Sequence, residues 1–362
     1  MNLWTRSLKT LKAQWHKPPD NSLKSIQLDI NTMRIVSIFT ALLLIIAVSS
    51  AHAEETAKMS SPQDLDYVGE MIYHDALHED TLIDLARRNN LGFVEMRAAN
   101  PLIDPWLPGE GTDIIIPAQH IFPHAKHEGI IINLPEMRLY LFPADGGTPI
   151  TYPIGVGRAG LETPEGATQV MRKAIGPIWR PTARMREEDP NLPEYIRPGP
   201  KNPLGTHALY LGWPQYAIHG TNKPFGIGRR VSSGCIRLYP EDILKLYDQV
   251  NVGNKVQVVN QPVKAGWIDD VFFVEANPTL DQSNDVEENG SSPFLTFSDQ
   301  DMDIISQAAG EFADQIDWSK IRAAIKDRKG YPVEIFMKPT PEISPAATTA
   351  HDHAPQTTDD NT

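Results

Sequence analysis

The sequence contains a single cysteine, Cys235, among 362 residues. One thiol forms no internal disulfide, so disulfide bonds do not stabilise this chain. The residues before it are small or polar, and an isoleucine and an arginine follow, in the order Ser232-Ser233-Gly234-Cys235-Ile236-Arg237. Gly234 leaves the backbone beside the sulfur unhindered, and a His219-Gly220 pair stands a short way upstream. This pattern favours a nucleophilic thiol over a small buried hydrophobic side chain.

Basic residues are also few. The chain carries 33 lysines and arginines against 46 aspartates and glutamates, a formal net charge of −13. A nucleic-acid surface needs clustered positive charge, so this balance argues against that class of partner. The glycine-bearing segment 221–231 lacks the Gly-Lys-Ser/Thr ending of a phosphate-binding loop. We therefore expect no nucleic acid, no nucleotide and no cofactor.

Metal-binding patterns are scarce as well. His120, His124 and His127 have the i, i+4, i+7 spacing of ligands on one helix face. Pro123 interrupts such a helix, and we expect no acidic partner for these histidines. We interpret the stretch as a linker and predict that no metal site is present.

The longest apolar run, residues 35–48, is shorter than the roughly 20 residues that span a bilayer. Met33-Arg34 precedes it, and the small-x-small site Ala51-His52-Ala53 follows. This order is typical of a cleavable signal peptide, here residues 33–53, and predicts export from the cytoplasm. An uncleaved inner-membrane anchor is the alternative. Residues 1–32 form an upstream extension or reflect a start codon placed too early.

Four further segments follow from composition and periodicity. Residues 65–121 predict a small α+β module, with a helix capped by Asp80 that runs to Asn89, a second helix at 93–99 and a strand at 113–116. Residues 128–260 are mainly β, with one helix at 240–250. Residues 261–337 predict an α/β extension in which 279–292 is a loop and Ser298 and Asp301 cap a helix. The tail, 338–362, is predicted to be disordered. The strands expected in the β region are 130–133, 137–142, 148–156, 167–173, 207–211, 216–219 and 255–259.

The residues around Cys235 supply the parts of an acyl-transfer site. His219 is the base that we expect to take the thiol proton, since imidazole titrates near neutral pH and Gly220 lets the chain turn away after it. The N–H groups of Gly234 and Cys235 are candidate oxyanion donors, and the Ser233 or Ser232 hydroxyl is a further one. The alternative for the serines is hydrogen bonding within the loop.

Arg237 lies two positions after the thiol. Its guanidinium can hold a substrate carboxylate, or it can form an internal salt bridge that fixes the loop. The sequence leaves both readings open.

Taken in order, Ile218-His219-Gly220-Thr221-Asn222, Ile227-Gly228 and Val231-Ser232-Ser233-Gly234-Cys235-Ile236-Arg237-Leu238 resemble the L,D-transpeptidase catalytic domain of the YkuD type. The resemblance covers about 128–260. Ser233 stands where many members have a histidine, so a second histidine has no role here. Further matching motifs are Pro153-Ile154-Gly155-Val156-Gly157, Thr163-Pro164-Glu165-Gly166, Trp179-Arg180-Pro181-Thr182, Pro198-Gly199-Pro200-Lys201-Asn202-Pro203-Leu204-Gly205 and His207-Ala208-Leu209-Tyr210-Leu211-Gly212.

The resemblance implies a β-sandwich-like catalytic domain and a periplasmic enzyme that acts on peptidoglycan. Cys235 would attack the third residue of a tetrapeptide stem and expel D-Ala, and Arg237 would be the substrate-side arginine. The acceptor would be another stem's diaminopimelate or the lysine of a Braun-type lipoprotein, with a lean toward the lipoprotein-anchoring, ErfK-like subgroup. It also implies acylation of Cys235 by carbapenems. The module at 65–121 resembles a LysM domain, which binds glycan strands; a structural cap on the next domain is the alternative.

Two other functions fit the same residues. Water in place of the amine would make the protein an L,D-carboxypeptidase or an amidase. A non-catalytic protein that binds peptidoglycan through residues 65–121 is the alternative of another class.

Overall fold

The computed structural model describes residues 66–292 and 298–339. All of them belong to one compact unit, Ser60–Thr362. The predicted signal peptide (33–53), residues 1–32 and nearly all of the predicted tail (338–362) lie outside the described residues. Within those ranges, no helix has both the length and the hydrophobicity to cross a membrane.

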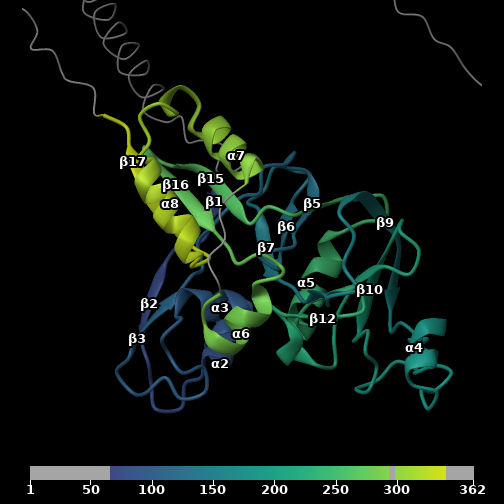
Figure 1. Ribbon diagram of the computed structural model, residues 1–362. Helices are drawn as coiled ribbons and strands as arrows, with labels where there is room; N and C mark the ends of the chain where they lie inside the picture. Colours follow the sequence, from purple (N-terminus) through teal and green to yellow (C-terminus); the bar gives the residue numbers. More distant parts are fainter. Residues whose placement is uncertain (1–65, 293–297, 340–362) are drawn as a thin grey trace, which may run out of the picture. The chain divides into compact units, whose positions relative to one another are not determined.

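Two short helices flanked by an antiparallel strand pair open the described chain (Figure 1). Strands β2 (Ile72–Asp75) and β3 (Asp113–Ile116) pair with each other, and helices α2 (Leu82–Arg88) and α3 (Phe93–Ala99) lie between them in sequence. The predicted helices and closing strand are confirmed. Their apolar residues form a separate small core: Ala76, Leu82, Leu85, Ala86, Leu91, Met96, Ile114 and Ile116.

The predicted cap of α2 is wrong by one position. Thr81 is the N-cap, and its side chain accepts a hydrogen bond from a first-turn N–H. Asp80 is buried instead, where its carboxylate accepts from the Leu77 N–H at 2.9 Å and pairs with His74 and Arg88. A carboxylate this deep needs several donors, and it ties the end of β2 to α2 rather than capping the helix.

An eight-stranded sheet forms the centre, in the order β13-β11-β10-β9-β14-β5-β6-β7, and it is curled (Figure 1). A separate pair, β8 and β12, is parallel. The mainly β prediction is confirmed, but β12 and β13 on either side of Cys235 were not predicted, because runs of two or three residues give no period-2 signal. The bounds are β5 Gly129–Asn133, β6 Arg138–Phe142, β7 Ile150–Pro153, β8 Val156–Gly157, β9 Gly166–Ile175, β10 His207–Leu211, β11 Ala217–His219, β12 Arg230–Ser232, β13 Ile236–Arg237 and β14 Lys255–Val259.

The two faces of this sheet bury different residues. On β5, Ile130 and Ile132 belong to the main core, whereas Ile131 faces a second cluster with Tyr140 and Phe142. Alternation along a strand explains the split, and burial on both faces explains why β5 reads as an unbroken apolar run.

Helix α5 (Pro240–Gln249) closes the main core, as predicted. Its stripe of Ile243, Leu246 and the following Val250 is fully buried. Lys173 of β9 donates to the carbonyls of Tyr247 and Val250 at 2.5 Å, which satisfies the end of the helix. The helix starts three residues after Arg237, so its packing anchors the strand that follows Cys235.

The C-terminal extension is a three-stranded sheet, β15-β16-β17, with helices on it. The predicted capping box of α7 is confirmed. The predicted loop at 279–292 is wrong, because Ser283–Asn289 forms helix α6, whose Val286 packs into the main core. The acidic residues there predict solvation, but Asp285 and Glu287 of the helix are half-buried and only Glu288 is exposed. The bounds are β15 Val263–Ile268, β16 Val271–Ala276, α6 Ser283–Asn289, α7 Asp299–Ala309, α8 Trp318–Asp327 and β17 Pro332–Met337, with short helices α4 Ala183–Glu188, η1 Pro224–Gly226 and η2 Gly310–Phe312 elsewhere.

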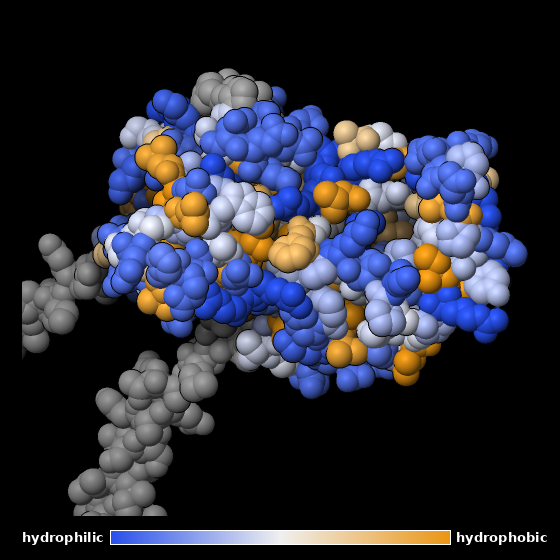
Figure 2. Space-filling view, turned by 90° about the horizontal axis from the view of Figure 1, so that it is seen from below, coloured by the Kyte–Doolittle hydropathy of each residue, from blue (hydrophilic) through white to orange (hydrophobic). Residues whose placement is uncertain are grey.

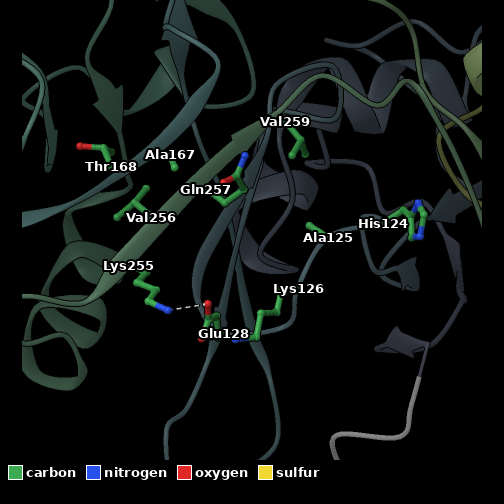
Figure 3. A pocket seen from close by; sticks show the side chains of 10 residues that line it. All are labelled: His124, Ala125, Lys126, Glu128, Ala167, Thr168, Lys255, Val256, Gln257 and Val259. Carbon is green, nitrogen blue, oxygen red and sulfur yellow. Dashed lines mark hydrogen bonds and ion pairs between the residues drawn. The ribbon is translucent and has the colours of Figure 1, made fainter.

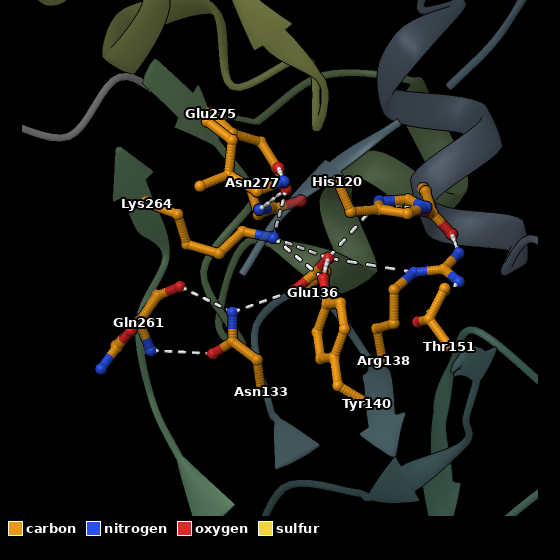
Figure 4. A network of polar contacts seen from close by, with 12 residues as sticks. His120, Asn133, Glu136, Arg138, Tyr140, Thr151, Gln261, Lys264, Glu275 and Asn277 are labelled. Carbon is orange, nitrogen blue, oxygen red and sulfur yellow. Dashed lines mark hydrogen bonds and ion pairs between the residues drawn. The ribbon is translucent and has the colours of Figure 1, made fainter. Parts of the chain in front are cut away.

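A buried charge network joins these three parts of the chain (Figure 4). Lys264 of β15 places its Nζ 2.7 Å from both Glu136 and Glu275, and all three side chains are fully buried. On the other side, Arg138 of β6 binds Glu95 of α3 at 2.6 Å. The helical module, the central sheet and the extension therefore share one set of ion pairs.

The interpretation of residues 120–127 as a linker without acidic partners is wrong for His120. This residue lies in β4 (His120–Ile121), which pairs with β1 (Tyr67–Val68), and its Nδ1 is 3.5 Å from both Glu95 and Glu136. Burial, together with Arg138 and Lys264, lowers the pKa of His120 well below its ordinary value. His120, Glu136 and Glu275 are close enough to hold a metal ion, but Lys264 already supplies the positive charge there.

One face of the surface is shown in Figure 2. Hydrophilic residues predominate on it, and hydrophobic residues form small patches separated from one another. Scattered apolar residues of this kind are normal for a protein surface.

Candidate active site

Cys235 lies in the turn between β12 and β13, and its side chain is half-buried. Strand β13 runs parallel to β11, with Ile236 opposite Ile218 and Arg237 opposite His219. This register puts Cys235 beside Ala217, two positions from His219. Positions two apart face the same side of a strand. The thiol and the imidazole are thus brought to one side of neighbouring strands from positions well separated in sequence.

The turn at Cys235 requires glycine before it. Gly234 has φ +104°, and a Cβ at this position would lie 2.8 Å from Cε1 of Tyr216. The positive φ and the lack of space beside Tyr216 each exclude a side chain at this position. Packing against Tyr216 therefore requires glycine here, and the role of Gly234 in leaving the sulfur unhindered stays a prediction.

The Ser232 side chain stabilises the turn through two hydrogen bonds within it. Its hydroxyl accepts from the Gly234 N–H at 3.1 Å and donates to the Cys235 carbonyl at 2.6 Å. The Gly234 N–H is therefore already engaged. In the described chain, the Cys235 N–H has no acceptor and the Ser233 hydroxyl makes no hydrogen bond. Of the candidate donors, these two are the ones left available.

The environment of the thiol favours its neutral form. Burial raises the pKa of Cys235, whereas the Ala217 N–H and the charge of Arg237 lower it in part. The thiol donates to the carbonyl of Gln215, with Sγ 3.5 Å from the oxygen. Gln215 has a left-handed φ of +72°, and nothing in the sequence singled it out.

His219 is buried at the end of β11. Its Nδ1 lies 2.5 Å from the Gly220 carbonyl and donates to it. This bond fixes the tautomer with the proton on Nδ1, so Nε2 carries the lone pair that can accept a proton. Burial lowers the pKa of His219 to about 4, and the charge of Arg237 acts in the same direction.

Gly220 thus contributes more than the flexible turn that the sequence predicts. Its carbonyl orients the imidazole, and its N–H donates to the His207 carbonyl at 3.2 Å. A Cβ here would lie 2.9 Å from Ile243 of α5, so glycine lets the helix pack against the strand end. The sequence could not reveal this partner, because it is a backbone carbonyl.

Arg237 has no carboxylate partner among the described residues. Its backbone N–H and carbonyl pair with Gly155 at 2.9 and 2.8 Å, while its guanidinium Nε is buried without an acceptor. Burial lowers the pKa of the guanidinium, and the nearby Cys235 raises it. The internal salt bridge that the sequence left open does not form in this part of the chain.

The segment 221–231 lies at the rim of the site and binds both to the N-terminal helical module and to the C-terminal extension. The N–H of Val94, at the start of α3, donates to the Gly228 carbonyl at 3.1 Å. A Cβ on Gly228 would lie 2.3 Å from the Cα of Gly92. From the other side, Arg229 binds Glu287 of α6 at 2.6 Å, and Arg230 donates to the Leu280 carbonyl at 2.7 Å.

A pocket of 420 Å³ lies away from this constellation, beside β14 and the 124–128 segment (Figure 3). Its lining includes the Lys255–Glu128 ion pair of 2.8 Å but none of the candidate catalytic residues. We assign it no part in the chemistry.

Residues 127–258 match the YkuD family model, described as the L,D-transpeptidase catalytic domain. The probable L,D-transpeptidase ErfK/SrfK of Salmonella typhimurium is 41% identical over 263 residues, which is 70% of this chain and 82% of that protein. The probable L,D-transpeptidase YbiS of Escherichia coli K12 is 41% identical over 257 residues, 69% of this chain and 81% of that one. A solved L,D-transpeptidase from Mycobacterium smegmatis has 21% identity and a TM-score of 0.30, with 37% of this chain and 58% of that chain covered.

The chain therefore belongs to the L,D-transpeptidase family, on the strength of its sequence relatives. Within the family it groups with ErfK and YbiS, and it is a cysteine transpeptidase.

Proposed function

We propose that this protein forms an acyl-enzyme on Cys235 with a peptidoglycan tetrapeptide stem and transfers it to an amine. The observation that carries the proposal is the guanidinium of Arg237, which has no partner among the residues that the structure describes. It lies on the strand that follows the only thiol and beside His219. An arginine without an internal carboxylate is suited to bind the carboxylate of a stem peptide.

In the first half-reaction, Cys235 acts as the nucleophile and His219 as the base. The thiol turns from the Gln215 carbonyl toward the imidazole, and Nε2 of His219 takes its proton as Sγ attacks the carbonyl carbon of the third stem residue. The tetrahedral oxyanion is bound by the Cys235 N–H, with the Ser233 hydroxyl as the second donor. When the C–N bond breaks, the proton passes from His219 to the departing D-Ala amine, and a thioester remains.

The second half-reaction reverses the roles. An acceptor amine attacks the thioester carbonyl, gives its proton to His219 and forms the new amide, and the proton returns to the sulfur. The acceptor is the lysine of a Braun-type lipoprotein or another stem's diaminopimelate, which gives a 3→3 crosslink. The likeness to ErfK and YbiS supports a shared acceptor class with these relatives.

The rest of the chain fits action on the cell wall. Helices α2 and α3 between the paired strands β2 and β3 support the assignment of residues 65–121 as a LysM-like module that binds glycan. The catalytic domain spans 128–260. The signal peptide at 33–53 would deliver the enzyme to the periplasm.

The test is a purified enzyme with a disaccharide tetrapeptide, with and without an added amine, followed by mass spectrometry of the products. The expected result is D-Ala release and an amide to the added amine, both lost in Cys235→Ala. Arg237→Gln should lower the rate by about 10- to 100-fold, since hydrogen bonds to charged groups contribute about 1.5–3 kcal/mol.

The same preparation gives a second readout. A carbapenem should add its mass to the wild type and not to Cys235→Ala, which has no other thiol. D-Ala release without transfer to any amine would identify the carboxypeptidase instead. An unmodified wild type, with no products, would overturn the cysteine mechanism and leave the wall-binding function.

A further inference from the structure

Thr163, in the loop after β8, joins two segments of the site through one hydroxyl. Its Oγ1 accepts from the Gly157 N–H at 3.1 Å and lies 2.8 Å from the Gly234 carbonyl oxygen. The Gly157 N–H can only donate, so the single hydroxyl proton of Thr163 is committed to Gly234. Thr163 is only 5% exposed as a residue, and competition from water is therefore small.

The carbonyl that Thr163 holds belongs to the same peptide unit as the Cys235 N–H. A trans peptide is planar, and its C=O and N–H point in opposite directions. Fixing the Gly234 carbonyl on the Thr163 side therefore fixes the Cys235 N–H on the other side.

The neighbouring peptide groups are fixed separately by Ser232, which binds the Gly234 N–H and the Cys235 carbonyl. In the described part of the chain, the Cys235 N–H is the donor that these bonds leave without an acceptor. A donor that is held in place but unused is what transition-state stabilisation requires.

We propose that Thr163 is a positioning residue for oxyanion stabilisation: its hydroxyl orients the Gly234–Cys235 peptide so that the Cys235 N–H meets the oxyanion. This inference rests on the proposed acyl transfer at Cys235. Thr163 itself touches neither the sulfur nor the substrate, and it acts through the backbone of Gly234.

The experiment compares two reactions of the same thiol. Acylation by imipenem passes through an oxyanion, whereas alkylation by iodoacetamide displaces iodide at a saturated carbon and forms none. Thr163→Val keeps the shape of the side chain and removes the hydroxyl. Its acylation rate should fall by about 10- to 100-fold, below the 10²–10³ that loss of a whole oxyanion donor costs. Its alkylation rate should stay within about twofold of the wild type, since no oxyanion donor takes part.

Two matched variants complete the test. Thr163→Ser keeps the hydroxyl and should restore acylation to nearly the wild-type rate. Thr168→Val removes a similar hydroxyl, which accepts from the Gly212 N–H at 3.1 Å outside the Cys235 loop, and should leave both rates unchanged. Thermal unfolding of each variant reports whether the fold is retained.

The outcomes separate the two claims. If imipenem acylates the wild type and Thr163→Val equally fast, the positioning role is wrong while the acyl-transfer function stands. Parallel loss of acylation and alkylation in Thr163→Val would make the residue merely structural and would also overturn the inference. If the wild type is not acylated at all, the proposed function fails, and the inference fails with it.

Discussion

The thiol and the imidazole of this site are held in their neutral forms. Burial raises the pKa of Cys235 and lowers the pKa of His219, since each charged form would lose hydration. Arg237 acts on both groups, favouring the thiolate and opposing the imidazolium. Both groups therefore start uncharged rather than as a preformed ion pair, and in the proposed reaction proton transfer accompanies the attack.

This ionisation state predicts the pH dependence of thiol modification. A raised pKa means that the thiolate fraction of Cys235 at neutral pH is smaller than that of a free cysteine. The alkylation rate should rise with pH at a midpoint above that of a cysteine peptide in the same buffer, because only the thiolate reacts. The measurement is the iodoacetamide rate against pH by intact mass, which is unambiguous with one cysteine. Full-rate alkylation at acidic pH would contradict the neutral pair.

At the scale of elements, the site depends on how two very short strands end. Strand β13 has only two residues, and β11 has three, yet their parallel register places Arg237 against His219. Helix α5 anchors the chain directly after β13. The Cys235 turn is thus a rigid connection between paired segments, which suits a nucleophile that must meet a fixed donor and base.

A matched pair of glycines tests the rigidity of this turn. Gly234 and Gly253 both have positive φ, +104° and +94°, but a Cβ meets Tyr216 at 2.8 Å only at Gly234, with nothing within 4 Å at Gly253. Gly253→Ala should show only the backbone cost, about 1–3 kcal/mol in the free energy of unfolding. Gly234→Ala should add the steric clash and lower the imipenem acylation rate by about 100-fold or more, since displaced reacting groups cost about 10²-fold.

Urea unfolding and acylation of both variants give the comparison. Equal acylation rates in Gly234→Ala and Gly253→Ala would show that the Tyr216 contact does not control the site.

At the scale of the molecule, the helical module and the C-terminal extension enclose the rim of the catalytic domain from two sides. Glu95 and Glu275 come from these flanking parts, and both meet the ion pairs of the central sheet. Burial raises the pKa of Glu275 to about 7, and the neighbouring Glu136 adds to the shift. Such a network is costly to assemble, and it is stable only when every member is present.

We therefore expect the stability of the whole fold to depend on Lys264. Lys264→Met removes the cation between Glu136 and Glu275, and it should destabilise the protein by about 3–5 kcal/mol, the cost of breaking a buried pair. The control is Lys255→Met, which removes an ion pair of nearly equal length, 2.8 Å to Glu128, but with a lysine side chain that is 67% exposed. That change should cost about 0–1 kcal/mol. Urea unfolding measures both, and similar losses would show that the buried network does not hold the parts together.

Most regular elements were predictable, because their signals are local. The apolar stripe of α5 and the capping box of α7 lie within one helix each, and the hairpin β5–β6 is framed by its own turn. The failures had nonlocal causes. The sequence predicts an acidic loop where α6 forms because the one apolar side chain of this helix, Val286, has its partners in the main core. His120 was placed in a linker because Glu95 and Glu136 are distant in sequence.

The sequence by itself determined the family and suggested the chemistry: a single thiol beside a glycine, a histidine upstream and an arginine after it, in an order that resembles the YkuD-type catalytic domain. These are properties of residue type and spacing, which a linear chain displays. Only the tertiary structure decided which groups remain available. Within residues 66–292 and 298–339, it engages the Gly234 N–H with Ser232, leaves the Cys235 N–H and the Arg237 guanidinium without a partner, and orients His219 through a backbone carbonyl. Hydrogen bonds and burial depend on which segments meet in space, and that is fixed by packing over the whole fold.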